Sequence, residues 1–401
     1  MVTEKIAGII CEYNPFHNGH AYQIEEIRRR GYGTVVAVMS GNTVQRGEFA
    51  IADKYARARA ALCGGADLVL ELPYPYSASS TEFFAAAGIR ILDAIGAHAV
   101  CFGSESAELE KLTAAARICA SSEFEEKYRE MSRSALGTAA AYFAAYKELT
   151  GEEMPSGSND ILGIAYLKAT ISEGAELKAE VVKRKGSGYR ETDLSLSEEK
   201  INPSAMMIRK EIANSGITER LCGLMPEEVL RIINESNISN PSEHLERTVL
   251  GFFRLASPMA LSADRISEAG GGLAEKLCKV SHKAQTLAEF KELAMGGKYT
   301  LSRVNRAMLH CMIGATEDDV RNPPAYSTVL GFNSKGKKLL STLRKSSRIP
   351  IVTKPADAPE ISESTARQSE LSYKADALYS LCFDKIGRSS DYITRMPERL
   401  S

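Results

Sequence analysis

Two histidines near the start of the chain have the spacing of a phosphate-binding turn. The segment His17-Asn18-Gly19-His20 follows an apolar run at residues 6–11 and precedes a helical pattern at 22–30. Unpaired N–H groups and the positive end of the helix dipole would attract an anion to this turn. Each imidazole can also donate a hydrogen bond to a phosphate and stabilise charge on departing pyrophosphate. The position directly after a first strand favours this reading over the alternative, in which the histidines only cap and pack the helix.

Apolar runs that recur along the first half predict the sheet that positions this turn. They lie at 35–39, 67–72 and 99–103, separated by helical patterns such as 52–63. Runs without polar alternation suit parallel strands covered on both faces, and right-handed crossovers join them into a doubly wound sheet. The predicted fold class is therefore α/β, with ligands at the carboxyl ends of the strands.

The rest of the chain reads as mainly helical. Beyond Glu105 we expect helices at 138–149 and 161–172, a strand at 180–184 that returns to the sheet, and a helix at 204–214. The chain then stays helical to about Gly314, and short strands are expected at 326–331 and 351–353 around a helix at 335–344. We expect a catalytic domain at 1–220 and a mainly helical domain at 221–401.

Composition limits the class of protein. The net charge of −1 over 401 residues gives no general sign of a nucleic-acid partner, so any basic surface must be local. The eight cysteines form no C-x-x-C pair, which argues against structural zinc and against a disulfide framework. With no apolar stretch long enough for a membrane span, a cytoplasmic protein is expected.

Charged residues after the second strand could bind a small carboxylate. The loop there carries Gln45, Arg46 and Glu48, and a planar guanidinium suits both carboxylate and phosphate groups. The alternative is that Arg46 pairs with Glu48. A second group of charges follows on the next helix, and its spacing is typical of a solvated face: Asp53, Lys54, Arg57 and Arg59.

Three further segments end strands or begin helices near the expected site. Gly103 could let a nucleotide approach the backbone or could simply end its strand. Asn159 could bind nucleotide or cap the helix expected near Ile161. The cations at the start of 183–188 could clamp the outer phosphates or form a basic surface loop.

Several sequence blocks together resemble the bacterial tRNA(Met) cytidine acetate ligase family, whose H-x-G-H turn is shared with nucleotidylyltransferases and class I aminoacyl-tRNA synthetases. The blocks are Glu12-Tyr13-Asn14-Pro15-Phe16-His17-Asn18-Gly19-His20, Met39-Ser40-Gly41-Asn42, Gln45-Arg46-Gly47-Glu48, Asp67-Leu68-Val69-Leu70-Glu71-Leu72-Pro73, Phe102-Gly103-Ser104-Glu105 and Ser158-Asn159-Asp160-Ile161-Leu162-Gly163.

The resemblance implies a reaction in two steps. Acetate attacks the α-phosphate of ATP to give acetyl-adenylate and pyrophosphate, and the acetyl group then passes to N4 of the wobble cytidine of elongator tRNA(Met). Magnesium is expected with the ATP phosphates. His17, His20 and Arg46 are the expected catalytic residues. The ATP site implied by matching positions comprises Ile10, Cys11, Glu12, Tyr13, Asn14, Pro15, Phe16, His17, Asn18, Gly19, His20, Ala21, Tyr22, Gln23, Gly103, Asn159 and Arg184.

Two positions depart from the family pattern. Arg190 stands where a His often follows a Gly-Tyr pair, so it is left out of the catalytic set. Met206 stands where the family usually has Thr in the helix start Ser204–Arg209, which removes one hydroxyl. Ser204 and Arg209 therefore either grip the triphosphate or belong to an ordinary capped helix.

A basic stretch in the second half is the expected contact for tRNA. Residues 298–354 contain eleven Lys or Arg and three acids, with Tyr299 and Tyr326 placed to stack on an unpaired base. A solvated surface is the alternative. Two other functions stay open: a nucleotidylyltransferase acting on a small phosphorylated cofactor precursor, and a non-catalytic RNA-binding protein.

Overall fold

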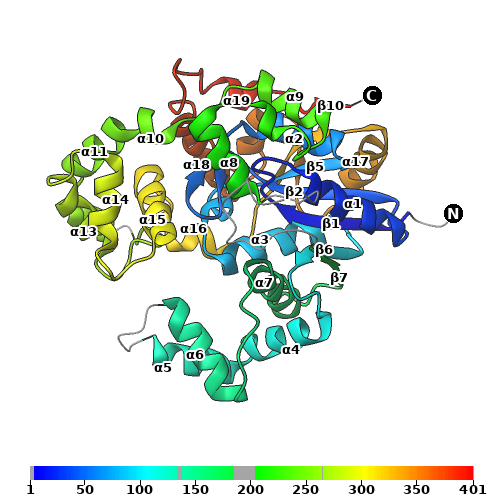
Figure 1. The fold of residues 1–401 in the computed structure, drawn as a ribbon, viewed down its shortest axis with the longest axis horizontal. Coiled ribbons are helices and arrows are strands. Elements are labelled where there is room, and N and C mark those ends of the chain that lie inside the picture. Colours follow the sequence, from blue (N-terminus) through cyan, green and yellow to red (C-terminus); the bar gives the residue numbers. More distant parts are fainter. Residues whose placement is uncertain (1–3, 133–137, 185–203, 264, 401) are drawn as a thin grey trace.

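A computed structural model describes residues 4–132, 138–184, 204–263 and 265–400. An eight-stranded sheet crosses its centre in the order β10-β8-β5-β2-β1-β6-β7, with β9 paired to β8 (Figure 1). The strands are β1 (Ile6–Cys11), β2 (Thr34–Ser40), β5 (Leu68–Leu72), β6 (Ala99–Ser104), β7 (Lys178–Lys183), β8 (Ser327–Phe332), β9 (Ile351–Val352) and β10 (Glu398–Arg399).

The strand order creates a switch point beside β1. From β1 the chain moves outward on one side to β2 and β5, and then returns to place β6 on the other side of β1. These strands are parallel, so their carboxyl ends meet at one edge of the sheet. A crevice at such a reversal is where doubly wound folds bind ligands.

Helices cover both faces of the sheet, as its residue pattern requires. In β2, Val36 and Val38 pack with one core, whereas Val35, Ala37 and Met39 pack with another on the opposite face. The first core involves α3 (Thr81–Ala94), α4 (Leu109–Cys119), α7 (Ser158–Ser172) and α17 (Ser334–Ser346). The second involves α1 (Asn18–Arg29), α2 (Lys54–Cys63), α8 (Ala205–Ser215) and α9 (Glu227–Glu235).

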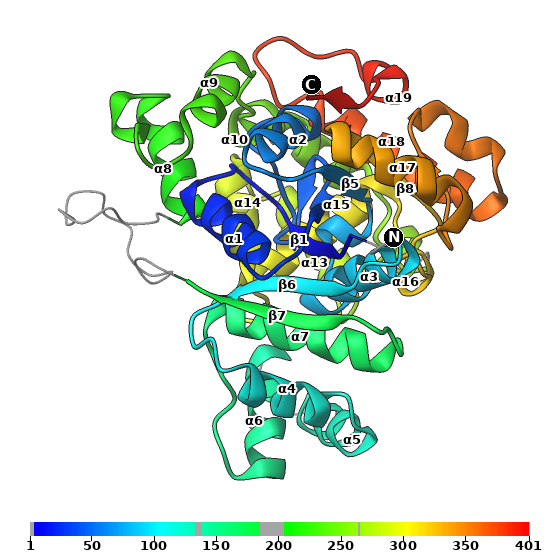
Figure 2. The ribbon, with the colours of Figure 1, turned by 90° about the vertical axis from the view of Figure 1, so that its right-hand side faces the viewer.

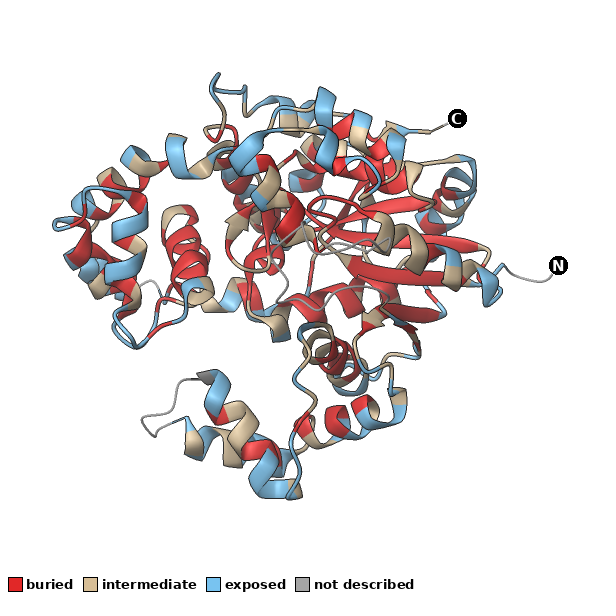
Figure 3. Ribbon diagram, in the orientation of Figure 1, coloured by how far each residue is buried: buried red, intermediate tan, exposed pale blue. Residues whose placement is uncertain are grey.

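Two helical groups project from this layered body. The lobe of α4, α5 (Ser122–Met131) and α6 (Thr138–Thr150) lies beyond β7 (Figure 2), and much of its outer surface is exposed (Figure 3). The other group has its own apolar core, which also includes α18 (Glu363–Tyr379). Its helices are α10 (Pro241–His244), α11 (Glu246–Leu255), α12 (Pro258–Ala263), α13 (Leu273–Ser281), α14 (Leu287–Met295), α15 (Leu301–Ile313) and α16 (Glu317–Arg321). The short helix α19 (Asp391–Thr394) precedes β10.

The expected α/β fold is confirmed, with one difference in the sheet. Every strand predicted in the first half is present, but β8, β9 and β10 come from beyond residue 220 and join the same sheet. Moreover, β8 runs antiparallel to β5, with a register shift at Val69/Leu70. The sheet therefore contains strands from both sides of residue 220. The division of the chain into two functional domains at that residue stays a prediction. Sequence reasoning also did not predict the small hairpin of β3 (Thr43–Val44) and β4 (Glu48–Phe49).

All eight cysteines are free thiols. Within the described ranges, no three side chains of His, Cys, Asp or Glu converge as a metal site would require. No helix in the described part of the chain is long and apolar enough to cross a membrane.

Candidate active site

The histidine turn begins α1, and the two rings brace it reciprocally. His17 is the N-cap residue, and its Nδ1 accepts a hydrogen bond from the Gly19 N–H at 3.1 Å. The Nδ1 of His20 accepts in turn from the His17 N–H at 3.2 Å. The rings stack with centroids 3.7 Å apart. Because both Nδ1 atoms accept, each neutral ring carries its proton on Nε2 and keeps that N–H as a donor for a ligand.

Electrostatics favour the neutral form of both rings. Burial, assisted by the positive charge of Arg184, lowers the pKa of His17 to about 3. Burial also lowers the pKa of His20, with further contributions from His17 and Arg184. The neutral Nε2–H groups and the N-terminal amides of α1 can therefore donate hydrogen bonds to an anion, while the positive charge comes from nearby arginine.

A cavity of about 450 Å³ opens at the switch point in front of this turn. It brings together Arg46, Gly103, Asn159 and Arg184 with most of the predicted stretch at 10–23. The members of that stretch that line the cavity are Ile10, Cys11, Glu12, Tyr13, Asn14, His17, Gly19, His20, Tyr22 and Gln23. The sequence-predicted residues thus converge onto one space from β1, α1, the β3–β4 hairpin, β6, α7 and the segment after β7.

The remaining members of the predicted stretch do not line the cavity but support the turn: Pro15, Phe16, Asn18 and Ala21. Pro15 and Phe16 are buried, and the Phe16 ring lies against both Tyr13 and His20. The Nδ2 of Asn18 donates to the Gly223 carbonyl at 2.6 Å and so ties the start of α1 to the segment before α9.

Asn14 and Arg209 fix the strand-to-turn connection. Arg209 of α8 donates to the Asn14 backbone oxygen at 2.8 Å and also lines the cavity. The Asn14 side-chain oxygen accepts from the Ile51 N–H, whereas its buried Nδ2 has no hydrogen-bond partner in the described part of the chain. A buried donor at a cavity wall is costly unless a ligand or water accepts its proton, so this amide marks a polar contact point.

Ser204 is the N-cap residue of α8, as expected if this segment is an ordinary capped helix. Its hydroxyl accepts from the Met207 N–H at 3.2 Å while Ser204 also lines the cavity. Met206 lines the same wall. The departure at Met206 therefore places a thioether where the family pattern has a hydroxyl.

Of the two alternatives for Asn159, the role of N-cap residue is wrong. Helix α7 begins at Ser158 with Gly157 as its N-cap, so Asn159 lies within the first turn. The backbone N–H groups of Asn159 and Asp160 donate to the Glu105 carboxylate, and the Asn159 Nδ2 donates to Glu105 Oε1 at 2.6 Å. The carboxylate of Glu105 therefore caps the helix from outside, and Asn159 is oriented by it at the cavity wall.

The hairpin of β3 and β4 forms the wall that faces the end of β1. Val44, Gln45, Arg46 and Glu48 all line the cavity. The Gln45 N–H donates to Glu12 Oε1 at 3.0 Å, and the Gln45 side chain donates to the Ser79 carbonyl at 3.2 Å. Arg46 therefore lies near Glu12, the residue that follows β1. A small carboxylic acid bound by Arg46 could meet a nucleotide phosphate in this part of the cavity.

The prediction of a solvated charged face at the start of α2 is wrong for two of its four residues. Lys54 and Arg57 are buried, and Asp53 is the N-cap residue of the helix. Lys54 Nζ lies 2.8 Å from Glu71 and 2.7 Å from Asp376. Because its partners come from β5 and α18, the sequence around Lys54 does not predict that this side chain is buried.

Apolar residues of α3 and α7 also line the cavity, and sequence reasoning did not single them out. They include Phe84, Leu162 and Tyr166. Helical periodicity assigns such residues to the core, and only the fold shows that they also border the site. Residues 185–188 of the expected clamp lie outside the described residues, as does Arg190, which was left out of the catalytic set. Lys183 and Arg184 line the cavity.

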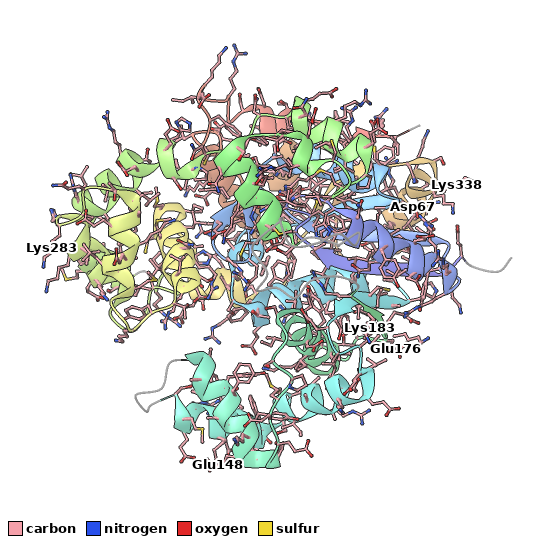
Figure 4. The ribbon with its side chains drawn as sticks, in the orientation of Figure 1. Asp67, Glu148, Glu176, Lys183, Lys283 and Lys338 are labelled. Carbon is pink, nitrogen blue, oxygen red and sulfur yellow. The ribbon has the colours of Figure 1, made fainter. Side chains whose placement is uncertain are left out.

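The expected stacking role of two tyrosines in the basic stretch is wrong. Tyr299 and Tyr326 are buried, 8% and 3% exposed, and the Tyr299 hydroxyl donates to the Gly271 carbonyl. The cations of the stretch also divide between two places. Helix α15 packs on α13, α14 and α18, whereas α17 packs on β2, β5 and β8. In Figure 4, Lys338 marks α17 on one side of the view, and Lys283, which precedes the stretch, marks the α13–α14 connection on the other side.

Comparisons with known proteins show the family of the chain. The family model described as HIGH nucleotidyl transferase matches residues 4–392. The tRNA(Met) cytidine acetate ligase of Acetivibrio thermocellus is 35% identical, covering 94% of this chain and 95% of that protein. The enzyme of the same name from Leuconostoc citreum is 31% identical over 98% and 97% of the two chains.

Two crystal structures of Thermotoga maritima TmcAL are also similar to the chain. The apo form has a TM-score of 0.89 and 30% identity, and it covers 99% of both chains. A form bound with alpha-thio ATP has a TM-score of 0.86 and 28% identity, again over 99% of both chains.

Proposed function

The chain belongs to the tRNA(Met) cytidine acetate ligase family of HIGH nucleotidyl transferases, and on this basis we propose that it is an ATP-dependent ligase that acetylates elongator tRNA(Met). The product is N4-acetylcytidine at the wobble position. The observation that carries the proposal is the pair of Nε2–H donors, His17 and His20, at a helix N-terminus that faces a cavity of about 450 Å³ at the switch point of the sheet.

In the first step a carboxylate oxygen of acetate attacks the α-phosphorus of ATP. The bond from that phosphorus to the bridging oxygen breaks, and pyrophosphate leaves with the electron pair. His17 and His20 donate to the phosphate oxygens on which charge develops, and the α1 amides add to this stabilisation. Arg46 orients acetate from the hairpin wall.

Magnesium would accompany the ATP phosphates and offset their charge. Among the described residues that line the cavity, Glu12 and Glu48 carry carboxylates. Two carboxylates with phosphate and water fit the oxygen preference of Mg²⁺ without a dedicated protein cage. The remaining binding roles fall to Asn14, Gly103, Asn159 and Arg184, which surround the space for the nucleotide.

In the second step N4 of the wobble cytidine attacks the acetyl carbonyl carbon. The bond to the adenylate oxygen breaks, AMP leaves, and the amine loses a proton. The helical half, residues 221–401, is proposed to bind the tRNA through cations of the 298–354 stretch, with α15 and α17 contributing separate contacts. Because Tyr299 and Tyr326 are buried, charge rather than stacking is the means of contact from this stretch.

The proposal is tested by acetate-dependent exchange of labelled pyrophosphate into ATP without tRNA. Wild-type protein is expected to catalyse exchange that requires acetate, and His20→Ala is expected to abolish it. Exchange that requires a phosphorylated cofactor precursor instead of acetate would favour a nucleotidylyltransferase. ATP binding without exchange under either condition would favour a non-catalytic RNA-binding protein.

A further inference from the structure

Arg57 is a buried cation that the proposed mechanism does not use. It is 0% exposed and lies on the second turn of α2, behind the wall of the cavity. In the described part of the chain no carboxylate lies within 4.0 Å of its guanidinium, whereas buried Lys54 on the same helix contacts two. A buried charge must be compensated, so the groups that surround Arg57 show what it does.

The hydrogen bonds of the guanidinium all go to backbone carbonyls, which belong to three segments. Nε donates to the Ala52 carbonyl at 3.0 Å. One Nη donates to the Glu12 carbonyl at 2.6 Å and to the Ser40 carbonyl at 3.1 Å, and the other donates to the Gly41 carbonyl. A planar five-donor fork can hold several carbonyls in fixed directions, which an ammonium cannot do.

Those carbonyls belong to the two strand ends that carry the proposed chemistry. Glu12 directly follows β1, on the segment that leads to the histidine turn. Ser40 ends β2 and Gly41 follows it, on the segment that leads to the hairpin with Arg46. One guanidinium therefore fixes the spacing and orientation of the two walls between which acetate and the α-phosphate would meet.

The backbone beside Glu12 needs such support. Tyr13 has a φ of +45°, a left-handed conformation that costs a non-glycine residue of the order of 1–2 kcal/mol. The Arg57 bond to the preceding carbonyl holds the peptide group that enters this strained residue. Strain of this kind persists only where the surroundings over-determine it.

We propose that Arg57 is a positioning residue for acyl-adenylate formation: by clamping the ends of β1 and β2 it holds the histidine turn and the Arg46 hairpin in register. The inference rests on the proposed function. Because Arg57 lies behind the wall and not in the cavity, it acts on the geometry of attack more than on ATP affinity. A misplacement of about 1 Å in a reacting geometry can cost about 100-fold in rate.

The test compares Arg57→Lys and Arg57→Ala with Arg59→Lys and Arg59→Ala. Arg59 lies two residues further along α2 and outside the cavity, so it controls for loss of an arginine from this helix. Acetate-dependent pyrophosphate exchange gives kcat and KM for ATP. Guanidinium chloride at low, non-denaturing concentration, matched with potassium chloride, tests chemical rescue.

For Arg57→Lys we expect kcat to fall about 100-fold with KM for ATP changed less than about threefold. For Arg57→Ala we expect a deeper loss that guanidinium partly restores, while wild-type, Arg57→Lys and the Arg59 variants gain nothing from it. Wild-type kcat in folded Arg57→Lys would overturn the inference, as would equal losses in the Arg59 variants. A parallel rise in KM without loss of kcat would also overturn it.

The outcome separates this inference from the proposed function. If wild-type protein lacks acetate-dependent exchange, the proposed function fails and this inference fails with it. If wild-type protein exchanges and the Arg57 variants match it, the inference alone fails. Should Arg57→Ala not fold, the kcat and KM of Arg57→Lys decide the question.

Discussion

The histidine turn and the start of α2 both carry charged or polar side chains, yet they use them in opposite ways. In the turn, the Nδ1 atoms of His17 and His20 accept from backbone N–H groups of Gly19 and His17, and both residues line the cavity. In α2, the hydrogen bonds of the Lys54 and Arg57 side chains go to buried protein groups. The turn presents donors to the cavity, whereas the cations of α2 bind protein groups behind it. On the proposed function, catalytic geometry depends on buried cations that do not line the cavity.

The largest expected effect tests the supporting region. Lys54→Ala leaves Glu71 and Asp376 buried without their cation, and removal of one member of a buried ion network costs about 3–5 kcal/mol. Although burial opposes the charge on Lys54, the carboxylates of Asp376 and Glu71 raise its pKa. Urea unfolding monitored by circular dichroism measures the loss.

The matched control is Lys111→Ala, which removes an exposed lysine that pairs with Glu108 on α4. Its effect on the urea midpoint is expected to be much smaller. Equal midpoints for the two variants would show that the Lys54 network contributes no more than a surface pair, and the contrast between the two regions would then be lost.

The next effect tests the ligand-facing region. His17→Ser keeps a good N-cap residue but removes the Nε2–H donor. We expect kcat for acetate-dependent exchange to fall about 10²–10³-fold, the usual loss for one donor to developing charge, with a smaller change in stability. His98→Ser is the control, because His98 Nδ1 also accepts from a backbone N–H, that of Ile6, outside the cavity. Similar kcat losses in both variants would mean that His17 serves only as a cap.

Acid should weaken the histidine turn through its lowered pKa values. The folded pKa of His17, about 3, lies below its value of roughly 6.5 in the unfolded chain. The contribution of the neutral ring to stability is therefore fully present above pH 6.5 and is lost as pH falls toward 3. Between pH 7 and pH 5 this amounts to about 2 kcal/mol.

Urea unfolding at the two pH values, in wild-type protein and His17→Ser, measures that contribution. The variant is expected to lose about 2 kcal/mol less than wild-type protein between pH 7 and pH 5. Parallel losses in the two proteins would show that His17 is not held neutral by its surroundings.

The smallest expected effect concerns the β3–β4 hairpin, which contacts helix α15. Gly47 has a φ of +70°, and a Cβ there would lie 2.4 Å from the backbone nitrogen of Arg306 in α15. Gly31 has a φ of +89° with open space around it. Gly31→Ala should therefore cost about 1–2 kcal/mol from backbone strain alone, and Gly47→Ala should cost more. Thermal unfolding compares them, and equal losses would contradict a close contact between hairpin and α15.

The sequence predicted the histidine turn but not the buried cations of α2. The turn was recognised because a strand, H-x-G-H and a helix follow one another locally. The strands β1, β2, β5, β6 and β7 were predicted because their apolar runs are local too. The role of Arg57 depends on carbonyls at residues 12, 40, 41 and 52, and that of Lys54 on residues 71 and 376. Only the fold brings these together, so charge spacing on α2 indicated a solvated surface instead. The antiparallel β8 was likewise predicted as a strand but not as a member of this sheet.

The central claim, attack of acetate on the α-phosphorus at the histidine turn, is tested most directly by isotope transfer. The protein is incubated with [¹⁸O₂]acetate, ATP and elongator tRNA(Met), and the AMP is examined by mass spectrometry. The account predicts one ¹⁸O in each AMP formed with N4-acetylcytidine, because the attacking carboxylate oxygen stays on phosphorus when the acetyl group leaves. Unlabelled AMP, or ADP as the nucleotide product, would contradict it.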